Sequence, residues 1–204
     1  MGSQYIAIRN EYLARAWARG PEVLAACLPA EPRPEGLLFR AFGEDCLLTP
    51  KDVFLASRPA EGPEGVLIAL YAGAVTDQEV DLYPLRAFKE LPGSMPYQAA
   101  FAANAEAVLV PWVERIFASQ DHLIRRFSGH PNEDAAAGDF SFTLRPLPKI
   151  PLYYVFHLPD EEFPAAVTCL FAAASTDFMP LDALADVAEY TAQKIIGLMQ
   201  QAGA

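Results

Sequence analysis

The last third of the chain contains two strongly apolar runs, separated by a short acidic segment that is bounded by prolines. The runs are residues 152–158 (Leu-Tyr-Tyr-Val-Phe-His-Leu) and residues 166–172. Aromatic and branched side chains favour strands, and a strand without a polar face is buried on both sides of its sheet. We therefore predict that the two runs are central strands of an antiparallel sheet, joined by an acidic turn into a C-terminal hairpin.

Apolar positions spaced by three and four residues predict helices elsewhere in the chain. The predicted helices are residues 4–18, 22–28, 97–118 (kinked at Pro111) and 181–202, and the shorter predicted strands are residues 37–42, 46–49 and 53–55. Segments 29–36 and 130–139 are expected to be loops, because they are rich in proline or in small polar residues. Segment 82–91, which contains Pro84, is expected to be a loop with one helical turn. With 204 residues, the chain is expected to form a single α+β domain over residues 1–204. That domain is an antiparallel sheet with the C-terminal hairpin, packed by N-terminal, middle and C-terminal helices.

The charge of the chain excludes some classes of partner. Acidic residues outnumber basic ones by 26 to 15, which gives a formal net charge of −11. A surface of this sign repels phosphate backbones and anionic lipids, so we expect no nucleic-acid and no membrane partner. In residues 150–204, Lys194 is the one basic residue against seven acidic ones. This acidic region is either a solvated face or a surface that attracts a cationic ligand, a metal or a basic partner.

The three cysteines, Cys27, Cys46 and Cys169, lie among apolar neighbours at long spacings. This pattern is typical of free, buried thiols in a reducing compartment, and the N-terminal segment lacks the apolar core of a signal peptide. We therefore expect a cytoplasmic protein. No CxxC pair is present, so no zinc or four-cysteine iron–sulfur site is assigned. Cys169 is either a nucleophile beside a histidine or, as we expect, an inert buried thiol.

The acidic turn is the strongest candidate for a binding site. His157 lies three residues before Asp160, and Glu161 and Glu162 follow. A turn brings a histidine and carboxylates together, which suits ligand binding, metal ligation or acid/base work. Tyr153 has the same strand parity as His157 and is included in this candidate site. The alternative is structural, because acidic side chains at a hairpin tip are solvated and an aspartate stabilises a turn through backbone amides.

Two runs in the same region, Leu147-Pro148-Lys149-Ile150-Pro151 and Asp160-Glu161-Glu162-Phe163-Pro164-Ala165, are each followed by an apolar strand. With these runs the chain resembles an uncharacterised bacterial family known as domain of unknown function 3786. The resemblance implies no established activity and no catalytic residues. Because some members are joined to a small iron–sulfur domain of the kind found in corrinoid iron–sulfur proteins, it implies a setting in anaerobic metal or corrinoid metabolism. This chain lacks the four-cysteine segment and an Asp-x-His-x-x-Gly pattern, so no cofactor is assigned.

The sequence contains no Gly-rich phosphate loop, GxSxG elbow or HExxH helix. We therefore expect a non-catalytic binding or accessory module for a small molecule, a cofactor or a protein partner, with a pocket between the sheet and the helix near Pro111. Two alternatives stay open. One is a metal-assisted or acid/base enzyme that uses His157 and residues 160–162. The other is a homodimeric interaction protein that pairs through its apolar segments 66–75 and 165–174.

Overall fold

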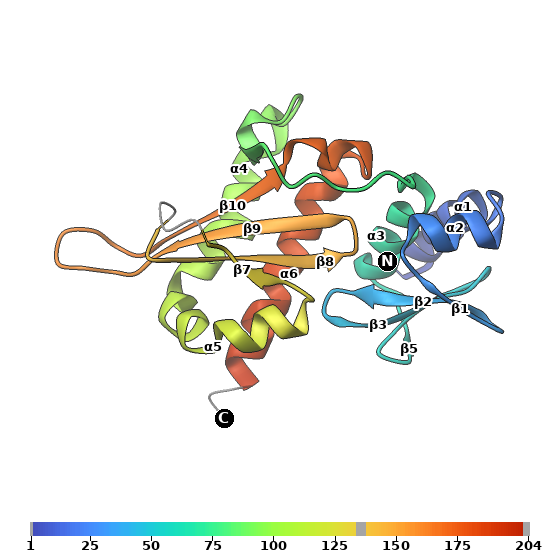
Figure 1. Ribbon diagram of the computed structural model, residues 1–204, viewed down its shortest axis with the longest axis horizontal. Coiled ribbons are helices and arrows are strands. Elements are labelled where there is room, and N and C mark those ends of the chain that lie inside the picture. The colour runs from blue at the N-terminus through green and yellow to red at the C-terminus, as the bar shows by residue number, and fades with distance from the viewer. Residues whose placement is uncertain (1, 134–137, 202–204) are drawn as a thin grey trace.

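Two antiparallel sheets of five strands each organise the chain (Figure 1). The computed structural model describes residues 2–133 and 138–201, with the first sheet built from the N-terminal part and the second from the C-terminal part. Helices pack against both sheets, and no helix in these described ranges is long and apolar enough to cross a membrane. The predicted α+β class is confirmed. That residues 1–204 form one domain stays a prediction.

The strands of the first sheet follow one another in chain order. They are β1 (Glu31–Arg33), β2 (Gly36–Ala41), β3 (Glu44–Leu48), β4 (Val53–Leu55) and β5 (Arg58–Pro59). The β2–β3 hairpin turns at Phe42 and Gly43, whose φ angles are 49° and 75°. Two successive positive φ values are what a tight type I′ hairpin turn requires. The accompanying helices are α1 (Gly2–Trp17), α2 (Pro21–Cys27) and α3 (Pro63–Ala74), of which α1 and α3 pack side by side.

The second sheet contains the two apolar runs as neighbouring central strands, as the sequence predicts. Its order is β6 (Leu85–Ala87), β10 (Ala166–Ala172), β9 (Ile150–His157), β8 (Phe140–Leu147) and β7 (His130–Pro131). In the β9–β10 pair, Cys169 lies opposite Tyr154 and Ala166 lies opposite His157. Every residue of β9 before His157 is buried. This burial on both faces explains why the sequence of the strand shows no polar alternation.

The middle helical segment departs from the kinked helix predicted for residues 97–118. It consists of α4 (Gln98–Phe101), a π-helical turn η3 (Ala102–Glu106), a 3₁₀ segment η4 (Ala107–Trp112) and α5 (Val113–Arg126). Pro111 has no N–H to donate to the carbonyl of Ala107, so a regular α-helical ladder cannot run through it. The last helix, α6 (Leu181–Gln201), packs along this segment. Shorter 3₁₀ turns are η1 (Phe88–Glu90), η2 (Met95–Tyr97) and η5 (Ala173–Asp177).

Two segments predicted as loops contain strands. Within residues 29–36 the chain forms β1, where Pro32 pairs with Leu37, and within residues 82–91 it forms β6, which pairs with β10. Both are edge strands, and there a proline without an N–H interrupts no ladder. These segments form strands because β2 and β10 have backbone groups at their edges with which they can pair. The residue preferences of the two segments alone do not predict this pairing. The predicted loop 130–139 begins with β7, and residues 134–137 lie outside the described ranges.

The turn between β8 and β9 fastens the second sheet to the end of α3. The Nζ of Lys149 donates hydrogen bonds to the carbonyl oxygens of Thr76 and Gln78, each at 2.7 Å. The backbone N–H of Lys149 donates to the hydroxyl of Tyr71 at 3.0 Å, and Lys149 is only 7% exposed. Within the 147–151 run, Pro148 and Lys149 therefore form a hairpin turn that anchors the second sheet to α3 and the segment after it.

Candidate functional site

The acidic turn that joins β9 to β10 projects beyond the end of the second sheet (Figure 1). Its Asp160 Oδ1 accepts hydrogen bonds from the backbone N–H groups of Phe163 at 2.7 Å and Glu162 at 2.8 Å. The N–H of Asp160 donates in turn to the carbonyl of Phe163 at 3.0 Å. These two N–H donors hold the pKa of the Asp160 carboxyl below its usual value. One of the three carboxylates is thus bound to the backbone of its own turn.

The other predicted site residues lie in two different surroundings. His157 is exposed at the end of β9 beside the turn, and Glu161 and Glu162 are exposed as well. Tyr153 is 2% exposed, and it lies within the sheet four residues, or two strand repeats, away from His157. The structure brings His157 to the acidic end of the hairpin and leaves Tyr153 apart. In the part of the chain that is described, no three His, Cys, Asp or Glu side chains are grouped so that they could hold a metal ion.

A polar contact that the sequence does not reveal lies beside Cys169. The Oε1 of Glu106, at the end of the π-helical turn, accepts a hydrogen bond from the backbone N–H of Cys169 at 2.9 Å. Burial raises the pKa of the Cys169 thiol well above its usual value, as it does for the neighbouring hydroxyl of Tyr154. A thiol in this state stays protonated at neutral pH and is a poor nucleophile. The geometry therefore supports an inert buried thiol.

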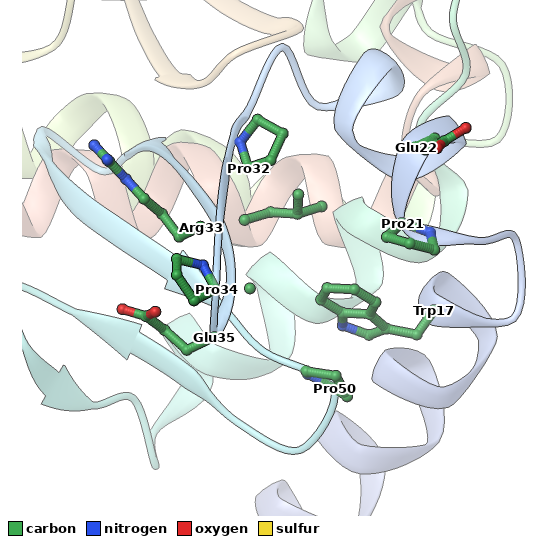
Figure 2. Close-up of a pocket in the computed structure, with 10 residues that line it drawn as sticks. Trp17, Pro21, Glu22, Pro32, Arg33, Pro34, Glu35 and Pro50 are labelled. Carbon is green, nitrogen blue, oxygen red and sulfur yellow. The ribbon is translucent and has the colours of Figure 1, made fainter.

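A cavity of about 240 Å³ lies between α1, α2 and the edge of the first sheet (Figure 2). Its apolar wall consists of Trp17, Leu37 and four prolines, namely Pro21, Pro32, Pro34 and Pro50. We call this cavity the Trp–Pro slot. Six of its ten lining residues form the run 32–37, and the others are Trp17, Pro21, Glu22 and Pro50. The slot is closed by segments that are distant in the sequence, so no local motif marks it.

The walls of the Trp–Pro slot are held in place by features that do not depend on a ligand. The Nε1 of Trp17 donates a hydrogen bond to the carbonyl of Thr49 at 2.9 Å, which fixes the plane of the indole ring. A Cβ at Gly36 would collide with the carbonyl oxygen of Leu48, so glycine permits this close approach of β2 and β3. The proline rings restrict the backbone of the opposite wall. The slot is therefore preformed.

The rim of the Trp–Pro slot is charged although its interior is apolar. Figure 2 shows the charged ends of Glu22, Arg33 and Glu35 turned away from the ring of Trp17. All three residues are exposed, and Arg33 Nη2 lies 2.8 Å from the Oε2 of Glu31. A mainly apolar interior with a few polar groups at the edge is the usual construction of a small-molecule site.

The sequence predicts a pocket between the sheet and the helix near Pro111. In the structure, aromatic side chains fill the interface between the sheet and the middle helical segment. The rings of Phe88 and Phe101 stack with centroids 4.3 Å apart, and Phe171 of β10 lies 5.7 Å from Phe101. Leu109, in the segment that precedes Pro111, is fully buried. This interface belongs to the hydrophobic core, and the Trp–Pro slot lies at the first sheet instead.

Comparisons with known proteins place the chain in a family. The comparison with curated proteins and the comparison with solved structures each returned no match. A family model, described as Domain of unknown function (DUF3786), matches residues 20–194. The match includes both runs that carry the resemblance in the sequence and most of the residues that line the Trp–Pro slot. The chain therefore belongs to the DUF3786 family.

Proposed function

We propose that the protein is a non-catalytic binding module that holds a small, flat, mainly apolar molecule in the Trp–Pro slot. The observation that carries this proposal is the preformed wall of Trp17 and prolines around an open cavity. A planar ring that stacks on an indole removes a large apolar area from water, and a rigid wall lowers the entropy lost on binding.

The lining of the slot favours binding over catalysis. Its residues, all within the described part of the chain, include no histidine, cysteine, serine, threonine, lysine or tyrosine. The acidic groups among them, Glu22 and Glu35, lie at the exposed rim. General acid/base and nucleophilic catalysis need such groups within hydrogen-bond reach of the reacting atom.

The size of the slot limits its ligand. An apolar cavity of about 150 Å³ is enough to bind benzene. The Trp–Pro slot, at about 240 Å³, accordingly suits a molecule of one or two rings. The charged rim suits a polar substituent that stays in contact with water.

A screen of neutral one-ring and two-ring aromatic compounds by ligand-observed NMR tests this proposal. We expect saturable binding to the wild-type protein and a loss of at least about tenfold in affinity for Trp17→Ala, which removes one wall of the slot. Trp112→Phe is the matched control, because Trp112 lies outside the slot. Trp17→Phe keeps an aromatic wall and is expected to bind with intermediate affinity. Equal binding by Trp17→Ala and wild type contradicts the proposal.

We propose separately that the acidic end of the β9–β10 hairpin contacts a basic protein segment. The contact would involve His157 and the carboxylates of residues 160–162. Phe163, on the same turn, supports this proposal because it is 66% exposed. An exposed aromatic ring bordered by charges of one sign is typical of a protein contact. Backbone amide shifts on titration with a hexalysine peptide test this. Shifts confined to residues 157–163, reduced in Phe163→Ala, are expected, and shifts spread over all acidic faces contradict it.

The homodimer alternative is based on the apolar segments 66–75 and 165–174, and both segments contribute to the hydrophobic core of the chain itself. The apolar segment 66–75 is α3 with the residue that follows it, and its Ile68, Ala69 and Tyr71 are fully buried within the chain. In segment 165–174, Cys169 and Phe171 are likewise buried.

A further inference from the structure

A second cavity, of about 290 Å³, lies where α1, α3 and α6 meet. It shares no residue with the Trp–Pro slot. Tyr5 comes from α1, Val66 and Leu67 come from α3, and α6 contributes Asp186, Glu189 and Tyr190. We call this the helix-junction cavity. Its wall combines hydrocarbon, two aromatic rings and two carboxylates.

The tyrosine wall contributed by α6 is fixed by its own packing. The ring of Tyr190 meets Phe42 edge to face, with centroids 4.6 Å apart. Burial and the carboxylates of Glu64 and Glu44 raise the pKa of the Tyr190 hydroxyl. The surroundings of this residue are therefore both apolar and negatively charged.

Among the residues that the structure describes, the carboxylates of the helix-junction cavity have no cationic partner. Glu189 accepts hydrogen bonds from the side-chain amides of Asn104 at 3.1 Å and Gln193 at 3.3 Å, and both donors are neutral. Asp186 takes part in no ion pair among the described residues. Partial burial, with Glu189 and Asp182 nearby, raises the pKa of the Asp186 carboxyl. A positive charge in this cavity would relieve that repulsion.

The nearest basic residue along α6 is already engaged. The Nζ of Lys194 lies 3.4 Å from the Oε1 of Glu44, and it also lies 5.5 Å from the centroid of the Tyr190 ring. Lys194 is not among the residues that line the helix-junction cavity. The helix-junction cavity thus keeps its negative charge. The ammonium group of Lys194 lies near the ring of Tyr190 but is paired with Glu44.

The composition of the wall suits an organic cation better than a metal ion. Divalent metals such as Ca²⁺ take six or more oxygen ligands, and across the described residues no three acidic, histidine or cysteine side chains are grouped for a metal. An ammonium group needs fewer partners. The hydrocarbon attached to it would lie against Val66 and Leu67, which a hydrated metal ion would leave uncovered.

We propose that the helix-junction cavity binds an organic ammonium compound, with its charged group beside Asp186 and Glu189 and its short hydrocarbon body against α3 and the tyrosine rings. Coulomb attraction and contact with aromatic faces both favour a cation there. This site is independent of the Trp–Pro slot. The two proposals can therefore succeed or fail separately.

Calorimetric titration of the full chain with n-hexylammonium and with 1-hexanol provides the test, because the two probes share the same hydrocarbon chain. At neutral pH and low salt, we expect the ammonium compound to bind at least about fivefold more tightly than the alcohol. Added salt should weaken binding of the ammonium compound and leave the alcohol unchanged. Equal affinity for the two probes overturns the proposal without any substitution in the protein.

Two variants of equal charge locate the site. Asp186→Asn is expected to weaken hexylammonium binding about fivefold, which corresponds to the loss of one partly exposed ion pair. Glu114→Gln removes the same charge from an exposed position on α5 and should leave the affinity within about twofold of wild type. Trp17→Ala should also bind hexylammonium normally. Equal losses in Asp186→Asn and Glu114→Gln would show a general charge effect and overturn the proposal.

Discussion

The ammonium group of Lys149 lies 2.7 Å from the carbonyl oxygen of Thr76, a contact that spans 73 residues of the chain. A buried cation is costly unless hydrogen bonds replace its hydration. Here two carbonyl oxygens from the segment after α3 supply that replacement. The turn at Pro148 and Lys149 therefore links the second sheet to the segment that follows α3 through the side chain of Lys149.

Replacing Lys149 by Met tests this link. The variant keeps an unbranched side chain but leaves the carbonyls of Thr76 and Gln78 without their donor. We expect a loss of about 2 kcal/mol in the free energy of unfolding, measured by urea denaturation. Lys51→Met is the control, because Lys51 is exposed and should change stability by less than about 0.5 kcal/mol. Equal effects of the two substitutions would contradict a structural role for the buried ammonium group.

The carboxyl of Glu106 makes stability depend on pH. Burial raises its pKa above the ordinary value of 4.5, so the folded protein binds more protons than the unfolded chain just above that pH. The free energy of unfolding therefore falls as pH rises through this interval. Glu106→Gln keeps an oxygen that accepts the Cys169 N–H and cannot ionise. We expect it to be more stable than wild type at neutral pH, with the advantage shrinking as pH falls through the raised pKa of Glu106 and gone below 4.5.

Glu106→Ala is the informative companion to the glutamine variant. It removes the acceptor altogether and leaves the N–H of Cys169 without a partner, at a cost of about 1–2 kcal/mol. Urea denaturation of both variants, at neutral pH and near pH 4, separates the loss of the charge from the loss of the hydrogen bond. A glutamine variant that matches wild type at every pH would show that burial of the charge has no effect on folding.

Asp160 is expected to order its turn without affecting global stability. Asp160→Ala removes the acceptor for the N–H groups of Glu162 and Phe163. Hydrogen exchange at these two amides should accelerate in the variant, while the urea midpoint stays unchanged because the turn is exposed. Asp160→Asn keeps an acceptor and should exchange at an intermediate rate. In wild type the same protection should be lost as pH falls below the ordinary aspartate pKa of 3.8, because the folded pKa is lower still.

The cysteines are expected to be unreactive in the folded protein. Cys27, Cys46 and Cys169 are all free and buried, and burial raises the pKa of the Cys46 and Cys169 thiols. A thiol-specific reagent such as dithionitrobenzoate should react slowly with the native protein and rapidly in urea, where all three thiols become accessible. Rapid reaction of one thiol under native conditions would revive Cys169 as a candidate nucleophile, provided that Cys169→Ser abolishes it.

The sequence predicts the β9–β10 hairpin well because β9 is buried on both faces and β10 is apolar at all but one position. The prolines and Asp160 mark the turn between them. The early hairpin is predicted from strand residues 37–42 and 46–49 around a short turn at residues 43–45, and the structure places the turn slightly earlier, at Phe42 and Gly43. These features depend on neighbours within a few residues.

The features that the sequence does not predict depend on distant segments. Glu106 meets Cys169 across 63 residues, and it does so where Pro111 forces the preceding helix into π and 3₁₀ turns. The edge strand β1 forms although it contains Pro32, and the edge strand β6 forms directly after Pro84. The Trp–Pro slot is likewise assembled from the end of α1, the start of α2 and two stretches of the first-sheet region, residues 32–37 and Pro50. For the predicted acidic site, the sequence places His157 beside the carboxylates but cannot show that Tyr153 is buried away from them.

Fluorine NMR of protein labelled with 5-fluorotryptophan tests the Trp–Pro slot most directly. The chain has two tryptophans, and Trp112→Phe assigns the resonance of Trp17. On titration with a neutral two-ring aromatic such as quinoline, we predict a saturable shift of the Trp17 resonance while the Trp112 resonance stays fixed. A stationary Trp17 resonance, or equal and unsaturable shifts of both, would contradict the proposal that this slot is the binding site.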